Sequence, residues 1–350
     1  MTIKKYIHIG YPKNFSTSLQ TGYFAKHQDL YHLGIGYESA NTGYIDKHIE
    51  IAMEQHLRFS KHFIYERVES DIANTFKKHF EAAASVGKKY VGVSSEHLSF
   101  NLTPDNIDIS EKVKRIRRIF DRDTKIIIIV RNQLSLFRSM YREAVRNGYH
   151  QSYASYVEYL YKFQARNFVP DFLYDRLYQL CYEYFQKENI LLIPMETVRE
   201  GNNGTLRRNS EGTQILTQKI SDFLEIEPFK EDLKHVNESL DGATTAALAQ
   251  LNNDNRYGLS NCLYDGEQMH RLRSYFESEL KCFPPKSDAD WQIKWANIDK
   301  AKLSKSEFPE KLDYSCDSDL LNRLKAFYAP SNKKLQELLN IDLSEYGYPV

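Results

Sequence analysis

Residues 6–19 of this 350-residue chain read YIHIGYPKNFSTSL, and their order of residue types predicts how the fold begins. Its first four residues have the length and β-branched content of a buried strand, which Gly10 and Pro12 bring to an end. The hydroxyl residues Ser16 to Ser18 then stand where a helix would begin, ahead of periodically spaced apolar residues. The stretch therefore predicts a strand, a turn and a helix in immediate succession.

The turn of this stretch, residues 10–18, has the composition of an anion-binding loop, and we call it the cradle. The first N–H groups of a helix lack partners within the helix, and Lys13 adds a full positive charge beside them. An anion bound there would gain charge-assisted hydrogen bonds of about 1.5–3 kcal/mol each. The order is not that of a Walker A loop, because Lys13 precedes the hydroxyl residues and Phe15 stands where a glycine is expected.

Charge and composition argue against several classes of function. The chain has 47 basic and 47 acidic residues, which disfavours general binding of nucleic acid or membrane surfaces. No apolar run approaches the roughly 20 residues of a membrane span, and the first strand begins too near Met1 for a signal peptide. We therefore expect a cytoplasmic protein, and the sequence does not predict its oligomeric state. Its four cysteines lack metal-ligand spacing and are expected to be reduced: Cys181, Cys262, Cys282 and Cys316.

Three further strand-like runs follow the first at spacings that leave room for helices: residues 89–94 (KYVGVS), 125–130 (KIIIIV) and 190–194 (ILLIP). Helical patterns fill the intervals, at residues 45–59, 71–84, 110–120, 133–146, 153–164 and 172–186. Strands that alternate with helices indicate a parallel sheet covered on both faces. The expected fold class is α/β, a P-loop-like three-layer fold with a central parallel sheet, flanking helices and a helical C-terminal part.

The strand signals stop after about Asn237, and the rest of the chain reads as helices joined by polar loops. No repeat, low-complexity tract or long linker interrupts the sequence. We therefore expect a single α/β domain over residues 1–350, in which residues 240–350 form a mainly helical flank or lid on the same core.

The strand KIIIIV ends in Arg131, at a place where a Mg²⁺-dependent P-loop enzyme commonly carries an aspartate. A guanidinium at a fixed strand end suits a phosphate group rather than a metal ion. Ser139 follows about two helical turns later and could bind the same anion. By contrast, we expect Arg138, Arg142 and Arg146 on the solvated face of that helix.

Two of these motifs resemble those of a known family. GYPKNFSTSLQ, residues 10–20, resembles the 5′-phosphosulfate-binding loop of sulfotransferases that use 3′-phosphoadenosine 5′-phosphosulfate (PAPS). Arg131 and Ser139, eight residues apart, match the spacing of that family's 3′-phosphate-binding motif. Further stretches are similar to bacterial and carbohydrate sulfotransferases: IPMETVRE, ISDFLEI and the closing FYAPSNKKLQELLNIDLSEYGYP.

The resemblance implies transfer of the sulfuryl group of PAPS to a hydroxyl acceptor, in line and without a metal, with 3′-phosphoadenosine 5′-phosphate (PAP) as product. The acceptor would be a hydroxyl-bearing small molecule or a carbohydrate, and the resemblance favours a carbohydrate or glycoconjugate. On this resemblance Arg131 and Ser139 hold the 3′-phosphate, and Lys13 also neutralises charge on the leaving oxygen. The resemblance also implies that the 5′-phosphosulfate is bound by the cradle residues Lys13, Asn14, Phe15, Ser16, Thr17 and Ser18. Asn14 and Phe15 depart from the family's usual Thr or Ser and Gly, and Phe adopts positive φ less cheaply than Gly.

The acceptor hydroxyl needs a base, and the segment VSSEHLSF after the second main strand offers two. Glu96 resembles the proposed base of carbohydrate sulfotransferases. His97 is the rival, since cytosolic small-molecule sulfotransferases use histidine and its unperturbed pKa suits neutral pH. We favour Glu96, and the choice between the two stays open.

Two other hypotheses also stay open. One is a divergent P-loop kinase or nucleotidase, which Mg²⁺-dependent turnover of ATP would reveal. The other is a non-catalytic nucleotide- or glycan-binding protein on the same fold, for which Phe15 is the best support. Finally, the basic run at residues 112–118 alternates with Val113 and Ile116, and we expect it on a solvated helix face.

Overall fold

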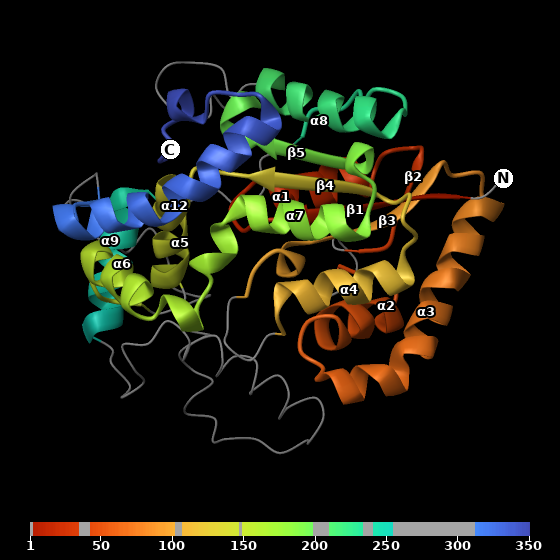
Figure 1. The fold of residues 1–350 in the computed structure, drawn as a ribbon, viewed down its shortest axis with the longest axis horizontal. Helices are drawn as coiled ribbons and strands as arrows, with labels where there is room; N and C mark the ends of the chain where they lie inside the picture. Colours follow the sequence, from red (N-terminus) through yellow and green to blue (C-terminus); the bar gives the residue numbers. More distant parts are fainter. Residues whose placement is uncertain are drawn as a thin grey trace. The chain divides into compact units, whose positions relative to one another are not determined.

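The computed structural model describes residues 3–34, 43–101, 107–146, 149–198, 210–233, 241–254 and 312–350 (Figure 1). The chain divides into two compact units, which are described separately below. The first comprises Met1–Leu136, Gln164–Asn237 and Asn322–Val350, and the second comprises Phe137–Phe163 and Glu238–Leu321. A single domain with a lid over residues 240–350 stays a prediction, and residues 255–311 of that segment lie outside the described part.

The first unit is built on a sheet with the strand order β2-β3-β1-β4-β5, in which all neighbouring strands are parallel. The strands are β1 Lys4–Gly10, β2 Leu30–His32, β3 Tyr90–Ser95, β4 Lys125–Val130 and β5 Ile190–Pro194. Four of them are the predicted runs. The sequence did not predict β2, because three residues are too few to show a periodic pattern.

The helices of the first unit surround this sheet: α1 Ser16–Ser18, η1 Leu19–Phe24, α2 Lys47–Ile51, η2 Ala52–His56, α3 His62–Ser85, η3 Glu96–Leu98, α4 Ile109–Ile119, η4 Gln164–Arg166, η5 Pro170–Phe172, α7 Tyr174–Tyr184, η6 Lys187–Asn189, η7 Met195–Val198, α8 Ser210–Leu224 and η10 Leu343–Tyr346. The second unit contains α6 Tyr153–Lys162 and α9 Gly242–Asp254. The helices α5 Gln133–Arg146 and α12 Ser318–Leu339 begin in one unit and end in the other. All six helices predicted before residue 190 are present; α5 has the predicted bounds, and the other five have shifted ends.

Both faces of the sheet are covered, which confirms the α/β three-layer class. On one face, η1 and α8 form a buried cluster with strand residues that include Tyr6, Ile127, Ile129 and Ile193. Alternate strand residues point to the opposite face, where α3 contacts β3, α7 contacts β5, and α4 lies against α7 (Figure 1). Every residue of β3 is buried, as expected for a strand inside a doubly covered parallel sheet.

The topology brings two predicted turns together. The chain leaves β1 towards β2 and β3, on one side, and leaves β4 towards β5, on the other side. The carboxyl ends of β1 and β4 therefore flank a topological switch point, the place where ligands of open parallel sheets bind. The cradle follows β1, Arg131 follows β4, and Gly10 pairs with Ile129 in the register of the two strands.

Among the described helices, none combines the length and the apolar character that crossing a membrane requires. Cys181 is a buried free thiol, and burial raises its pKa to about 12, which leaves it in the unreactive thiol form. Cys316 is free and half-buried. Cys262 and Cys282 lie outside the described residues.

Candidate functional site

The cradle joins β1 to the helical run that begins at Ser16, and its backbone passes through two left-handed residues. Lys13 has a φ of 61° and Phe15 a φ of 69°. This conformation costs a residue with a Cβ about 1–2 kcal/mol, and such strain is concentrated at functional sites. Turns of this kind can direct successive N–H groups towards a bound anion. Phe15 therefore adopts the positive φ that its side chain makes expensive.

Internal hydrogen bonds hold the cradle against the sheet. Asn14 is fully buried, and its Nδ2 donates to the carbonyl oxygen of Ile129 on β4 at 2.9 Å. Ser16 Oγ donates to the carbonyl oxygen of Tyr11 at 3.2 Å. A Cβ on Gly10 would lie 2.6 Å from Ser16 Oγ, so a larger residue at the end of β1 would displace the Ser16 side chain. The side chains of Asn14 and Ser16 thus shape the loop.

The other cradle residues differ in their exposure. Lys13, Phe15 and Thr17 are half-buried, whereas Ser18 is buried. The ring of Phe15 packs against the core cluster beneath η1 and α8. Lys13 and Thr17 are therefore the predicted cradle residues that combine a polar side chain with partial exposure.

A buried imidazole lies on β1 just before the cradle. His8 is fully buried, and its Nδ1 shares a hydrogen bond of 2.7 Å with Ser94 Oγ, which also accepts from Gln20 Nε2 at 2.9 Å. Burial, with a smaller contribution from His32, lowers the pKa of His8 to about 3. His8 is therefore neutral near pH 7 and links β1, β3 and η1.

Arg131 reaches from the end of β4 to the cradle. Its Nη1 donates to the carbonyl oxygen of Lys13 at 3.2 Å, and its Nε donates to Ser135 Oγ at 2.8 Å. Its own carbonyl oxygen accepts from Tyr174 Oη at 2.6 Å. The turns that carry Lys13 and Arg131 are thus joined directly. The sequence analysis missed Ser135, although a hydroxyl four residues after Arg131 at a helix start was a usable signal.

Ser139, the second residue of the predicted 3′-phosphate motif, is half-buried on α5 in the second unit. Its pairing with Arg131 therefore stays a prediction. In the same unit, Arg142 Nε donates to Tyr314 Oη at 2.6 Å, and the guanidinium of Arg138 lies 5.5 Å from the centre of the Tyr314 ring. Arg138 is exposed as expected, whereas half-buried Arg142 has this aromatic partner instead of a fully solvated position.

The two candidate bases open η3, directly after β3 and beside β1. Ser95 Oγ accepts the N–H of His97 at 3.3 Å and so begins the turn. Ser99 Oγ is within hydrogen-bond distance of the carbonyl oxygens of Gly10 and Glu96. Glu96 and His97 are both half-buried. The segment 96–101, which we call the base turn, is therefore fastened to the start of the cradle.

A buried lysine on α4 donates hydrogen bonds to the base turn. Lys112 on α4 is fully buried, and its Nζ donates to the carbonyl oxygens of His97 at 2.6 Å and Phe100 at 3.2 Å, and to Asn101 Oδ1 at 2.8 Å. Burial, followed by the charge of Arg58, lowers the pKa of Lys112 to about 7. The prediction of a solvated face is wrong for this residue, because its three donors all have protein acceptors.

A second connection runs from the base turn to the cradle through Asp171. Its Oδ2 accepts the N–H of Asn101 at 2.6 Å, and its carbonyl oxygen accepts from Tyr11 Oη at 2.9 Å. Burial raises the pKa of Asp171 to about 7. Tyr11 is fully buried, so the connection does not depend on solvent-exposed side chains.

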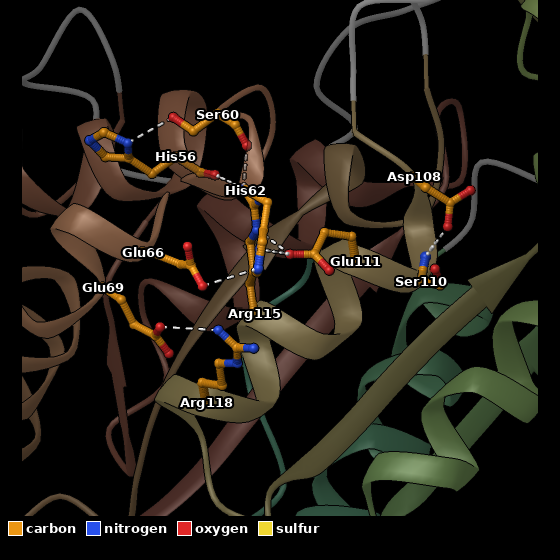
Figure 2. Close-up of polar contacts among 10 residues, drawn as sticks. All are labelled: His56, Ser60, His62, Glu66, Glu69, Asp108, Ser110, Glu111, Arg115 and Arg118. Atoms are coloured by element: carbon orange, nitrogen blue, oxygen red, sulfur yellow. Dashed lines mark hydrogen bonds and ion pairs between the residues drawn. The ribbon is translucent and has the colours of Figure 1, made fainter. Parts of the chain in front are cut away.

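The basic run on α4 has a further buried member, shown in Figure 2. Arg115 Nε donates to Glu111 Oε1 at 2.9 Å, and Arg115 Nη1 donates to the carbonyl oxygens of His56 at 2.6 Å and Ser60 at 2.7 Å. Only 1% of Arg115 is exposed, so the solvated face is wrong here too. Lys114 on the same helix is exposed, as expected. Arg115 closes the end of η2 and is structural.

The carboxyl edge of the sheet thus gathers three kinds of group. Lys13 and Arg131 supply positive charge from turns in contact. The cradle supplies N–H groups on a left-handed backbone. Glu96 and His97 supply a carboxylate and an imidazole from the next strand end. Such an edge can bind an anion and accept a proton from a group beside it.

Comparison with known proteins gives matches in solved structures alone. No family model and no curated protein matches the chain. The crystal structure of a sulfotransferase from Alicyclobacillus acidocaldarius is similar at 16% identity and a TM-score of 0.49, over 98% of each chain. Mouse sulfotransferase SULT7A1 complexed with PAP is similar at 16% identity and a TM-score of 0.31, over 71% of this chain and 64% of that one. Both proteins are named as sulfotransferases, the family that the cradle and Arg131 motifs resemble.

Proposed function

We propose that this protein is a PAPS-dependent sulfotransferase that transfers a sulfuryl group to a hydroxyl acceptor. The observation that carries the proposal is the hydrogen bond of 3.2 Å from Arg131 Nη1 to the carbonyl oxygen of Lys13, at the switch point of the sheet. A donor with anionic groups at its 3′ and 5′ positions needs two cationic sites on turns of fixed separation. The turns after β1 and β4 meet that requirement.

In this proposal the cradle binds the 5′-phosphosulfate through Lys13, Thr17 and the N–H groups of residues 14–18, with Asn14, Phe15 and Ser16 fixing the loop. Arg131 and Ser139 bind the 3′-phosphate. Bidentate geometry and permanent charge make a guanidinium well suited to that group. Lys13 has the additional role of stabilising negative charge on the bridging oxygen as it leaves.

The reaction is a single displacement at sulfur. The acceptor oxygen bonds to sulfur, and the bond from sulfur to the bridging phosphate oxygen breaks with its electron pair retained by PAP. The acceptor proton passes to Glu96 or His97, and the product is a sulfate monoester. Because the base turn is tied to Gly10, the base and the cradle keep a fixed separation, which in-line transfer requires.

The resemblance of Glu96 to the base of carbohydrate sulfotransferases supports a carbohydrate or glycoconjugate as acceptor. Metal independence is part of the proposal, and turnover that persists after treatment with EDTA would support it. The non-catalytic alternative rested on Phe15. That argument is weaker than it was, since Phe15 adopts a φ of 69° despite its side chain.

Titration calorimetry with PAP tests the proposal. We expect wild-type protein to bind PAP, and we expect Lys13→Ala and Arg131→Ala each to weaken binding by roughly ten- to a hundredfold, as for lost charge-assisted hydrogen bonds. Lys77→Ala and Arg67→Ala, at exposed positions on α3, are matched controls and should bind like wild type.

Two results would refute the proposal: wild-type protein that does not bind PAP, or PAP binding that both Lys13→Ala and Arg131→Ala leave unchanged. A Mg²⁺-dependent turnover of ATP in place of PAP binding would favour the kinase or nucleotidase hypothesis instead.

A further inference from the structure

The turn that carries Arg131 is held by a carboxylate from the end of the neighbouring strand. Glu196 lies in η7, directly after β5. Its Oε1 accepts the N–H of Asn132 at 3.0 Å, and its Oε2 accepts from Tyr348 Oη at 2.8 Å. One carboxylate therefore joins the β4 turn to the last residues of the chain.

The C-terminal residues make further contacts with the same turn. Asn132 Nδ2 donates to the carbonyl oxygen of Tyr346 at 3.5 Å. Asn332 exchanges hydrogen bonds of 2.8 and 3.2 Å with the amide of Gln133, and its Nδ2 donates to the carbonyl oxygen of Pro349 at 2.8 Å. Asn332 and Gln133 are fully buried. We call Glu196, Asn332 and residues 346–349 the C-terminal clasp.

The clasp acts on the backbone that aims the Arg131 side chain. Asn132 Oδ1 accepts the N–H of Ser135 at 3.0 Å and so begins α5. Ser135 Oγ donates to the carbonyl oxygen of Asn132 at 3.0 Å and accepts from Arg131 Nε at 2.8 Å. A shift of Asn132 would therefore move Ser135 and, with it, the guanidinium. No clasp residue needs to touch a ligand for this effect.

We propose that the C-terminal clasp is a positioning device for Arg131, and that it sets the preference of the site for nucleotides that carry a 3′-phosphate. The inference rests on the proposed function, because it assigns the 3′-phosphate to Arg131. Glu196 and Tyr348 are its central residues, since they connect the C-terminus to the N–H of Asn132.

The test compares two nucleotides in the variant Tyr348→Phe, which removes a single hydroxyl group. Calorimetry should show PAP binding weakened about tenfold, the effect of one hydrogen bond to a charged acceptor. Binding of adenosine 5′-phosphate, which lacks the 3′-phosphate, should be unchanged. A general loss of structure would weaken both nucleotides alike and would overturn the inference.

Tyr328→Phe is the matched control. Tyr328 lies on α12 and is fully buried, and its hydroxyl donates to the carbonyl oxygen of Val169 at 2.9 Å. It should lower the melting temperature about as much as Tyr348→Phe and leave PAP binding unchanged. Should Tyr348→Phe fail to fold, Glu196→Gln weakens the same contacts at constant side-chain length and should show the same selective loss.

The double variant Arg131→Ala, Tyr348→Phe completes the test. If the clasp acts through Arg131, the second substitution should add no further loss of PAP affinity. Additive losses would overturn the inference, as would a Tyr348→Phe protein that binds PAP like wild type while Arg131→Ala does not. Wild-type protein that fails to bind PAP would instead refute the proposed function, and the inference with it.

Discussion

The turns after β1 and β4 stand side by side and are held in different ways. The cradle combines left-handed Lys13 and Phe15 in its own backbone with hydrogen bonds to distant segments, from Asn14 to β4 and from Tyr11 to Asp171. At residues 131–133 the β4 turn has no positive φ, and it is held by side chains that follow β5 in the sequence, among them Glu196 and Asn332. One anion site thus has strain in its own backbone, whereas its neighbour depends on side chains that follow β5 in the sequence.

Asn332 and Asn14 are both fully buried, so replacing each with alanine compares how much the two turns contribute to stability. Asn332→Ala removes three hydrogen bonds and leaves the Gln133 amide and the Pro349 carbonyl without them. We expect the free energy of unfolding to fall by about 3 kcal/mol, against about 1 kcal/mol for Asn14→Ala, which removes one bond. Urea unfolding measures both. Equal losses would contradict the idea that the β4 turn carries more long-range support.

Lowering the pH should destabilise the folded protein through His8, which lies on β1 just before the cradle. The folded protein binds this proton only near pH 3, whereas the unfolded chain binds it near the ordinary pKa of about 6.5. The unfolded state thus holds more protons, and the free energy of unfolding should fall by about 1.5 kcal/mol between pH 6.5 and about 5 from His8 alone. Urea unfolding at both pH values should show that His8→Gln removes this part of the slope. An unchanged slope would exclude His8 as its source.

Alanine variants of Gly347, which lies in the clasp, and of Gly87, which does not, distinguish backbone strain inside the clasp from the same strain elsewhere. Both have positive φ, at 75° and 72°. A Cβ on Gly347 would lie 3.4 Å from Asn132 Nδ2, whereas a Cβ on Gly87 would meet nothing within 4 Å. Each change to alanine should destabilise the protein by about 1 kcal/mol. A distance of 3.4 Å is ordinary contact, so we expect Gly347→Ala to act through its strained backbone, which joins Tyr346 to Tyr348 of the clasp. Only this variant should also weaken PAP binding, and equal nucleotide affinity in the two variants would argue against the clasp.

Phe15 gives the smallest and most local test. Phe15→Ala and Phe15→Gly both remove the ring, so their difference in stability reports the left-handed backbone. We expect the glycine variant to be more stable by about 1 kcal/mol, the reverse of the order at an ordinary helical position such as Lys77. Thermal unfolding of the four variants at these two positions measures the difference. The ordinary order at residue 15 would mean that the cradle is unstrained.

The sequence alone was sufficient to predict those features of the fold and the site that depend on local residue patterns. Four strands, the strand-turn-helix at residues 6–19 and the place of Arg131 at a strand end follow from periodicity and turn residues. Lys112 and Arg115 were missed because helical periodicity marks buried apolar positions and cannot distinguish a buried lysine with three carbonyl or amide acceptors from a solvated one.

The clasp escaped prediction for a different reason. Glu196 and Tyr348 lie 152 residues apart, and no local pattern reports a contact over that separation. The quoted segment IPMETVRE did place a carboxylate just after a strand, which was a usable signal. Arg131 in the β4 turn was thus recognised from its charge in the sequence, whereas the residues that hold this turn could be identified only from the structure.

Sulfotransferase activity can be measured as transfer of ³⁵S from labelled PAPS to a panel of hydroxyl-bearing acceptors, with carbohydrates foremost. We expect a labelled sulfate ester with wild-type protein, formed in the presence of EDTA and reduced at least about a hundredfold in Lys13→Ala and Arg131→Ala. Wild-type protein that binds PAP but transfers no label to any acceptor would contradict the proposed function.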